Sequence, residues 1–152
     1  MSDILLFQYG SNLDPEQKEA RTGPIREARP GRLPGYRLAF NKHATDGGVY
    51  ANIVQEPAQE VWGVVYRCTP DAVRLMDERE GVPDGHYRRV EVTVRLETGE
   101  LTEAMTYVAG HRFLCPEGRP NQEYLNRILR GARHHELPEA WIKVVKEIAG
   151  RV

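Results

Sequence analysis

The chain has 152 residues, of which 40% are hydrophobic and 28% are charged, a composition typical of one soluble globular domain with its own core. Its 21 basic and 22 acidic side chains give a net charge of −1, which argues against nucleic acid or an acidic membrane surface as a partner. Cys68 and Cys115 are far apart, and no apolar run reaches membrane-spanning length. We therefore expect neither a disulfide scaffold nor a membrane span, but one domain over residues 1–152 in the reducing cytoplasm.

The N-terminal segment predicts a strand that leads directly into a capped helix. Ile4–Phe7 is an apolar run typical of a buried strand. Asp14 suits the helix N-cap, Pro15 suits the first helical position, and Gln17 lies where a capping box needs it. Gly10–Asn12 then forms a tight turn whose amide hydrogens point outward, which favours carboxylates and developing oxyanions. An ordinary strand-to-helix loop fits the same pattern.

The middle of the chain is mostly extended. Residues 21–33 are rich in glycine, proline and charge and predict a surface loop. Further strands are predicted at Tyr36–Phe40, Tyr50–Gln55, Glu60–Cys68, Tyr87–Glu97 and Leu101–Ala109. Residues 60–68 are apolar at both odd and even positions, which indicates a central strand covered on both faces or the wall of a barrel.

Three helices are predicted after the first one. Thr69 caps a helix that runs to Glu80, Asn121 opens another, and the last follows Pro138 and buries Trp141, Val145 and Ile148. About six strands and about four short helices indicate an α+β fold, a small curled mixed β-sheet or β-barrel with the helices packed outside.

Glu80 is the acid that the sequence singles out. Glu78 has Arg74 one turn back, whereas Glu80 has no cation at the neighbouring helical positions. Glu80 also lies at the C-terminal end of its helix, where the dipole disfavours negative charge. Both effects, together with burial, would raise the pKa of Glu80 towards the range that a general base needs near neutral pH. A solvated acidic helix end is the alternative.

Other candidates have simpler explanations. The hydroxyls of Tyr87 and Tyr124 could face a pocket, although core packing explains both residues equally well. His134 and His135 are adjacent, so on a helix they diverge and cannot share a metal. A basic stripe could contact RNA, but it also fits a solvated helix face; it consists of Arg127, Arg130, Arg133 and His134.

Four motifs in one collinear order resemble the γ-glutamylcyclotransferase family. They are Tyr9–Leu13, Val61–Tyr66, Leu75–Val82 followed by His86-Tyr87, and Asn121–Tyr124 followed by Gly131-Ala132 and Leu137-Pro138. The resemblance covers most of the chain and implies a small β-barrel with flanking helices and a cavity at one side. Such enzymes release 5-oxoproline because the α-amino nitrogen of a γ-glutamyl compound attacks its own γ-carbonyl, a reaction that needs no cofactor.

The resemblance also implies roles for individual residues. Glu80 corresponds to the catalytic glutamate, and the substrate-binding positions are Tyr9, Gly10, Ser11, Asn12, Leu13, Tyr87 and Tyr124. The expected function is cyclisation of a small γ-glutamyl amino acid or γ-glutamylamine, without metal, membrane or nucleic acid. The leaving group stays open, and so does the oligomeric state, a homodimer included.

Two further points qualify this expectation. A non-catalytic small-ligand-binding or protein-interaction domain on the same fold is the alternative. Gln8 stands where many relatives have a small residue, and a side chain facing the pocket would alter which leaving group fits.

Overall fold

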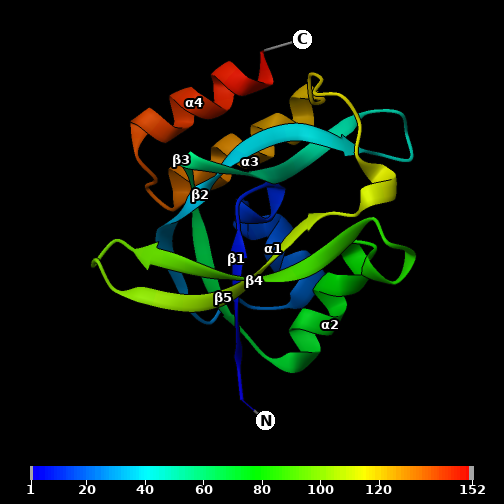
Figure 1. Cartoon of the computed structure of the whole chain (residues 1–152). Helices are drawn as coiled ribbons and strands as arrows, with labels where there is room; N and C mark the ends of the chain where they lie inside the picture. The colour runs from blue at the N-terminus through cyan, green and yellow to red at the C-terminus, as the bar shows by residue number, and fades with distance from the viewer. Residues whose placement is uncertain (1, 151–152) are drawn as a thin grey trace.

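The computed structural model describes residues 2–150, which form a closed five-strand barrel with helices around it (Figure 1). The strands are β1 (Ile4–Gln8), β2 (Ala28–His43), β3 (Val49–Cys68), β4 (Tyr87–Leu96) and β5 (Leu101–Ala109). The α-helices are α1 (Pro15–Thr22), α2 (Pro70–Arg79), α3 (Gln122–His134) and α4 (Glu139–Ala149). Short 3-10 helices occur at η1 (Ser11–Leu13), η2 (Val82–Asp84) and η3 (His111–Phe113). The predicted α+β barrel is confirmed, with one strand fewer than expected.

The barrel closes through its first and last strands. The strand order is β1-β3-β2-β4-β5, and β1 pairs in parallel with β5 at Leu6 and Met105. All other pairings are antiparallel, so the sheet is mixed, as predicted. Figure 1 shows α3 and α4 together on one side of the strands and α2 on the other. Within residues 2–150, no helix is long and apolar enough to cross a membrane.

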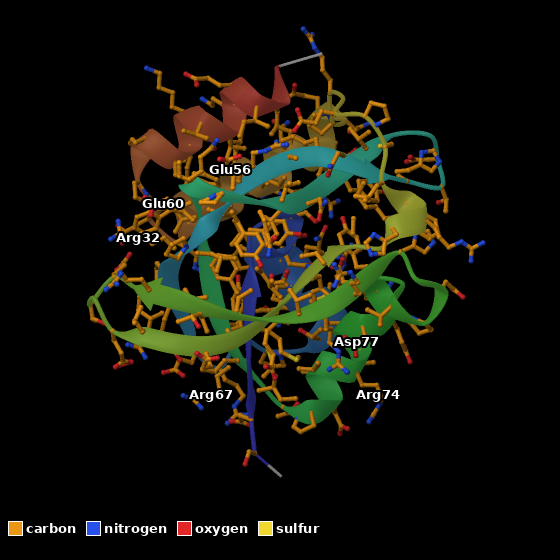
Figure 2. The ribbon with its side chains drawn as sticks, viewed as in Figure 1. Arg32, Glu56, Glu60, Arg67, Arg74 and Asp77 are labelled. Atoms are coloured by element: carbon orange, nitrogen blue, oxygen red, sulfur yellow. The ribbon has the colours of Figure 1, made fainter. Side chains whose placement is uncertain are left out.

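Two predictions about the middle of the chain are wrong. Tyr50–Gln55 and Glu60–Cys68 belong to one 20-residue strand, β3, and the predicted loop over residues 21–33 is strand from Ala28 onward. The charged residue Arg32 of this strand is partly exposed and pairs with Glu60 of β3 at 3.4 Å (Figure 2). A register shift after Pro34 accommodates the proline without ending the strand.

The helix starts follow the capping residues closely. Asp14, Thr69 and Asn121 each accept a hydrogen bond from a backbone amide in the first turn of the helix that follows. The capping box expected at Gln17 does not form, because the Gln17 side-chain amide binds Ser11 and Asn12 instead. At the last helix, Trp141 and Val145 are buried and Ile148 is partly buried.

Helix α3 lies directly on the 3-10 turn η1. A β-carbon at Gly131 would overlap the backbone of Leu13 and Asp14, so only glycine permits this close approach. Leu13, Ile128 and Ala132 around this contact are fully buried. The turn at residues 11–13 is therefore held against a rigid helix, which fixes the backbone at one edge of the cavity.

Candidate active site

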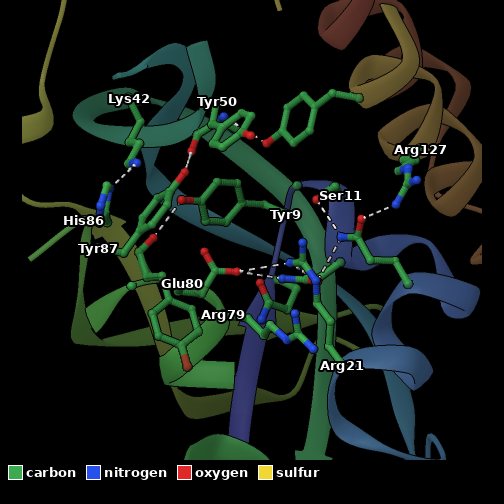
Figure 3. A pocket seen from close by; sticks show the side chains of 18 of the residues that line it. Tyr9, Ser11, Arg21, Lys42, Tyr50, Arg79, Glu80, His86, Tyr87 and Arg127 are labelled. Atoms are coloured by element: carbon green, nitrogen blue, oxygen red, sulfur yellow. Dashed lines mark hydrogen bonds and ion pairs between the residues drawn. The ribbon is translucent and has the colours of Figure 1, made fainter. Parts of the chain in front are cut away.

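A cavity of about 640 Å³ lies where β1 ends and α2 ends (Figure 3). It brings together seven of the eight residues singled out from the sequence: Tyr9, Gly10, Ser11, Asn12, Glu80, Tyr87 and Tyr124. Leu13 was predicted to bind substrate with them, but it is fully buried in the core and does not line the cavity. Successive side chains of a 3-10 turn point about 120° apart, so Leu13 faces α3 while its neighbours face the cavity.

Glu80 reaches the cavity from the C-cap of α2. The chain turns there because Gly81 takes a left-handed conformation with φ 64°, and His86 packs against the place where a β-carbon would stand. The side chain of Glu80 is only 14% exposed. Burial raises the pKa of Glu80, while Arg21, the Asn12 hydrogen bond and Lys42 act to lower it, and Asp77 adds to the increase.

Arg21 is a site residue that the sequence reasoning missed. Its Nη1 lies 3.8 Å from Glu80 Oε1 and donates to Asn12 Oδ1 at 3.0 Å. Asn12 Nδ2 in turn donates to Glu80 Oε1 at 2.9 Å. The expectation that Glu80 lacks a local cation holds along its own helix only, because α1 supplies one from across the cavity. Arg21 fell within the predicted surface loop, and no local pattern marks it.

The turn at Ser11 and Asn12 is held by side chains from two helices. Gln17 Nε2 donates to Ser11 Oγ at 2.7 Å and to Asn12 Oδ1 at 3.1 Å, and Arg127 donates to Gln17 Oε1 at 2.7 Å. On the same stripe of α3, Arg130 pairs with Asp14 at 2.8 Å. Two residues of the predicted basic stripe thus have intramolecular partners that stabilise this turn.

The same turn keeps hydrogen-bond donors available to a ligand. Among residues 2–150, no acceptor is bonded to the backbone N–H groups of Ser11 and Asn12. The Ser11 hydroxyl already accepts from Gln17, so its own proton is free to donate. A ligand oxygen placed at this turn would therefore meet several donors at once.

Three tyrosines form the wall of the cavity around Ala51 and Tyr107. The hydroxyl of Tyr9 donates to the Tyr107 carbonyl at 2.7 Å, and that of Tyr87 donates to the Ala51 carbonyl at 2.7 Å. The Tyr124 hydroxyl accepts from the Ala51 amide at 3.0 Å. Burial raises the pKa of all three hydroxyls, so they stay protonated at neutral pH and shape the cavity rather than exchange protons.

Lys42 and His86 occupy another part of the cavity wall, and sequence reasoning assigned them no role. Lys42 Nζ lies 2.8 Å from His86 Nδ1, and the lysine is only 3% exposed. Aromatic rings of Tyr50, Tyr87 and Phe113 surround the ammonium group at 5.7, 5.3 and 5.0 Å. Burial lowers the pKa of Lys42, and burial and Lys42 together lower the pKa of His86, so the imidazole is neutral at pH 7.

The arrangement suits proton transfer next to a developing negative charge. It places one carboxyl of raised pKa beside a turn with unused amide donors, in a cavity large enough for a small molecule. Gln8 lines the same cavity and is 5% exposed. Within the described residues, no group of three or more histidine, cysteine, aspartate or glutamate side chains is arranged to hold a metal ion.

Comparison with known proteins points to one family. Residues 60–145 match the model of the AIG2-like family. A gamma-glutamylcyclotransferase from Mus musculus is 31% identical over 151 residues, which cover 95% of this chain and 78% of the mouse protein. The gamma-glutamylcyclotransferase from Homo sapiens has the same identity, 31%, and the same coverage, 95% and 78%. A solved structure of a gamma-glutamyl cyclotransferase superposes with a TM-score of 0.87 at 29% identity, covering 95% of this chain and 87% of that one.

Proposed function

The chain belongs to the AIG2-like gamma-glutamylcyclotransferase family, and we propose that Glu80 transfers the protons of the cyclisation from which this enzyme class takes its name. The enzyme acts on a γ-glutamyl compound and releases 5-oxoproline together with a free amine or amino acid. One observation carries the assignment of Glu80. Its hydrogen bond with Asn12, 2.9 Å long, places a buried carboxyl of raised pKa beside the turn with unused amide donors.

The reaction needs one new bond and breaks one old bond. The α-nitrogen of the γ-glutamyl group attacks the γ-carbonyl carbon and closes a five-membered ring, and the bond from that carbon to the leaving nitrogen then breaks. The α-ammonium group loses two protons and the leaving nitrogen gains two, so the step consumes no water. Both reacting groups belong to one molecule, so the protein has only to hold the substrate in its folded-back conformation.

Glu80 suits the proton transfers because its pKa is raised by burial. An ordinary glutamate is a weak base towards an α-ammonium group, since their pKa values differ by about four units. Raising the pKa of Glu80 narrows that difference, so the carboxylate takes a proton from the ammonium group more readily. The protonated acid then returns the proton to the leaving nitrogen. Asn12 and Arg21 hold the carboxylate in place during the exchange.

The turn at Ser11 and Asn12 supplies the complementary donors. As the γ-carbonyl becomes tetrahedral, its oxygen gains negative charge that backbone N–H groups stabilise without reorganisation. The Ser11 hydroxyl adds a third donor on the same side. The substrate α-carboxylate binds at this end of the cavity too, where Arg21 and Arg127 contribute positive potential.

A product assay tests this function. Purified protein is incubated with a panel of γ-glutamyl amino acids, γ-glutamylamines and glutathione, and 5-oxoproline is measured by mass spectrometry. We expect release of 5-oxoproline from at least one member of the panel and its loss in the Glu80→Gln variant. Calorimetric binding of these compounds without any product would contradict the proposal and favour a non-catalytic ligand-binding domain.

A further inference from the structure

We propose that Lys42 forms a subsite for a carboxylate on the leaving group, so that the enzyme selects γ-glutamyl amino acids over γ-glutamylamines. This inference rests on the proposed function, because it concerns the far end of the same substrate. It assigns a specificity role to Lys42 together with His86, which holds it.

Lys42 is a buried cation that forms no ion pair within the described residues, although Glu80 attracts it from a longer distance and acts to raise its pKa. Within residues 2–150 every ion pair joins an arginine side chain to a carboxylate, and none of them involves Lys42. Asp46 and Asp84 line the same cavity, yet neither is paired with it. Burial of an ammonium group without a contacting counter-charge destabilises the folded protein, and burial lowers the pKa of Lys42 even though Glu80 acts to raise it. Lys42 is only 3% exposed and lies in the cavity wall, so we expect a negatively charged ligand bound in the cavity to supply its ion-pair partner.

The ammonium group also has unused donors. It carries three N–H groups, and His86 Nδ1 accepts one of them at 2.8 Å. This bond requires a neutral imidazole, which Lys42 itself favours by lowering the pKa of His86. The remaining neighbours are aromatic rings at 5.0 to 5.7 Å, which attract a cation but replace no hydrogen-bond acceptor. Two donors are thus left for a ligand oxygen.

The position of Lys42 fits the leaving group rather than the α-carboxylate. Figure 3 shows Lys42 and His86 on one side of Glu80, and Ser11 and Arg127 on the opposite side. A γ-glutamyl amino acid carries two carboxylates, one on each side of the γ-carbonyl that must lie near Glu80. A γ-glutamylamine carries only the α-carboxylate. A cavity with cationic groups on both sides of Glu80 therefore complements the substrate that has two negative ends.

The subsite also gives a physical basis for discrimination. A substrate with a leaving-group carboxylate forms a charge-assisted hydrogen bond with Lys42 in a largely desolvated place. A substrate without it leaves the buried ammonium group unpaired, and sites of this kind discriminate strongly against ligands that lack the expected group. Selectivity then follows from the loss of a partner rather than from the size of the leaving group.

The test uses two substrates that differ only in this carboxylate. γ-Glutamyl-L-alanine and γ-glutamylethylamide have leaving groups of the same carbon skeleton apart from the carboxylate, and kcat/KM for 5-oxoproline release is measured for each. We expect the unchanged protein to prefer the alanine compound by about 10- to 100-fold, the range for one charge-assisted hydrogen bond. In Lys42→Met this ratio falls towards one, mainly through a higher KM for the alanine compound.

Three controls separate specificity from folding. Lys143→Met removes an exposed lysine of α4 and should keep the original ratio. Lys42→Arg keeps the charge and should restore part of the preference. The melting temperature of Lys42→Met should not fall, because methionine replaces a buried charge with an apolar group of similar length.

The outcomes also separate this inference from the proposed function. If the unchanged protein releases 5-oxoproline from both substrates but Lys42→Met keeps the same ratio, the subsite is overturned and the cyclotransferase function stands. If the unchanged protein releases 5-oxoproline from neither of these substrates nor from any member of the wider panel, the function and the subsite are both overturned. Release from another member of the panel but from neither of these two overturns the subsite alone. A preference for the ethylamide in the unchanged protein also overturns the subsite.

Discussion

Asn12 and Glu80 are 68 positions apart in the chain, yet Asn12 Nδ2 donates to Glu80 Oε1 at 2.9 Å. Asn12 stands on the turn after β1, and Glu80 is the C-cap of α2. The side-chain oxygen of the same asparagine accepts from Arg21 and from Gln17. One amide thus links the acid, its nearest cation and the helix that holds the turn, and several consequences can be tested.

Replacing Glu80 by glutamine should abolish most of the turnover and keep the fold. Glutamine still accepts the hydrogen bond from Asn12 but cannot carry a proton, and the loss of a general acid or base costs roughly 10²–10⁴-fold in rate. The measurement is 5-oxoproline release at substrate saturation. The matched control is Glu78→Gln, which changes an exposed acid two positions earlier and should leave the rate near that of the unchanged protein.

The Glu80→Gln variant should not lose stability near pH 7. The pKa of Glu80 is raised in the folded protein, so its ionisation disfavours folding as pH rises above the ordinary range of glutamate. A neutral glutamine at position 80 removes that cost.

For the turnover experiment, a large loss of turnover in Glu78→Gln, or full turnover in Glu80→Gln, would show that Glu80 is not the catalytic acid.

Replacing Arg21 by glutamine should shift the pH profile of kcat/KM to higher pH on its acid side. Arg21 lowers the pKa of Glu80, so loss of its charge lets that pKa rise further. The carboxylate form that acts as a base then disappears at a higher pH as the solution is acidified. Glutamine keeps a donor for Asn12, which limits the structural change.

The matched control for this profile is Arg74→Gln on α2. Arg74 is exposed and pairs with Asp71 at 2.8 Å, on the solvent side of the helix (Figure 2). Its removal should leave the acid side of the profile in place. An Arg21→Gln profile that moved to lower pH would contradict the role of Glu80 as the base.

Replacing Gln8 by leucine should stabilise the protein. Gln8 is 5% exposed, and its Nε2 has no partner among the described residues. Leucine has a similar volume and removes the unpartnered donor, which should raise the free energy of unfolding by about 1 kcal/mol and the melting temperature by about 2–4 °C. Thermal unfolding followed by circular dichroism measures the change.

A satisfied buried group provides the contrast to Gln8. Thr106 is fully buried on the neighbouring strand, and its hydroxyl donates to the Phe7 carbonyl at 2.8 Å. Thr106→Val removes this hydrogen bond, so it should lower the free energy of unfolding by about 1 kcal/mol and the melting temperature with it. A fall in melting temperature for Gln8→Leu as well would mean that the glutamine amide is bonded in solution.

Replacing Gly131 by alanine should destabilise the protein and slow catalysis. The new β-carbon would overlap the backbone of Leu13 and Asp14, so α3 and the turn must move apart. Overpacking of this kind costs about 1–3 kcal/mol, more than the gain of up to about 1 kcal/mol in helix propensity. Denaturant unfolding gives the stability, and the displaced Ser11 should lower kcat/KM.

Gly118→Ala is the control for that change. A β-carbon at Gly118 would meet the side chain of Val49 at 3.5 Å, an ordinary contact. Its stability should stay near that of the unchanged protein. If Gly131→Ala proved more stable than the unchanged protein, the close approach of α3 to the turn would not be required.

Local patterns predicted the elements that local interactions form. The cap residues Asp14, Thr69 and Asn121 marked where three helices begin, because each side chain bonds an amide within the following turn. Alternation of apolar residues predicted β4, and pairing through the turn at residues 98–100 predicted β5, almost residue by residue. Glu80 was singled out for similar reasons, because its place at a helix end and the lack of a cation one turn away can be recognised from the adjacent residues.

The predictions failed where distant partners decide the structure. The charged stretch before Leu33 was expected to be a loop, but pairing with β3 extends its second half as a strand, where Arg32 forms an ion pair with Glu60. Leu13 was grouped with the cavity residues because the motif is continuous in sequence, although the turn directs its side chain towards α3. The capping role of Gln17 gave way to bonds with Ser11 and Asn12, which local pattern cannot reveal.

The sequence by itself therefore determined where the helices and most strands lie, which acid stands at a helix end, and which turn presents free amide groups. Only the tertiary structure decided that Arg21 approaches Glu80 and that His86 holds Lys42 in the same cavity. The physical reason is the separation along the chain of the residues that interact. Caps and periodicity depend on neighbours within one or two turns, whereas these pairs depend on barrel closure and strand register, which bring distant segments together only after the whole chain has folded.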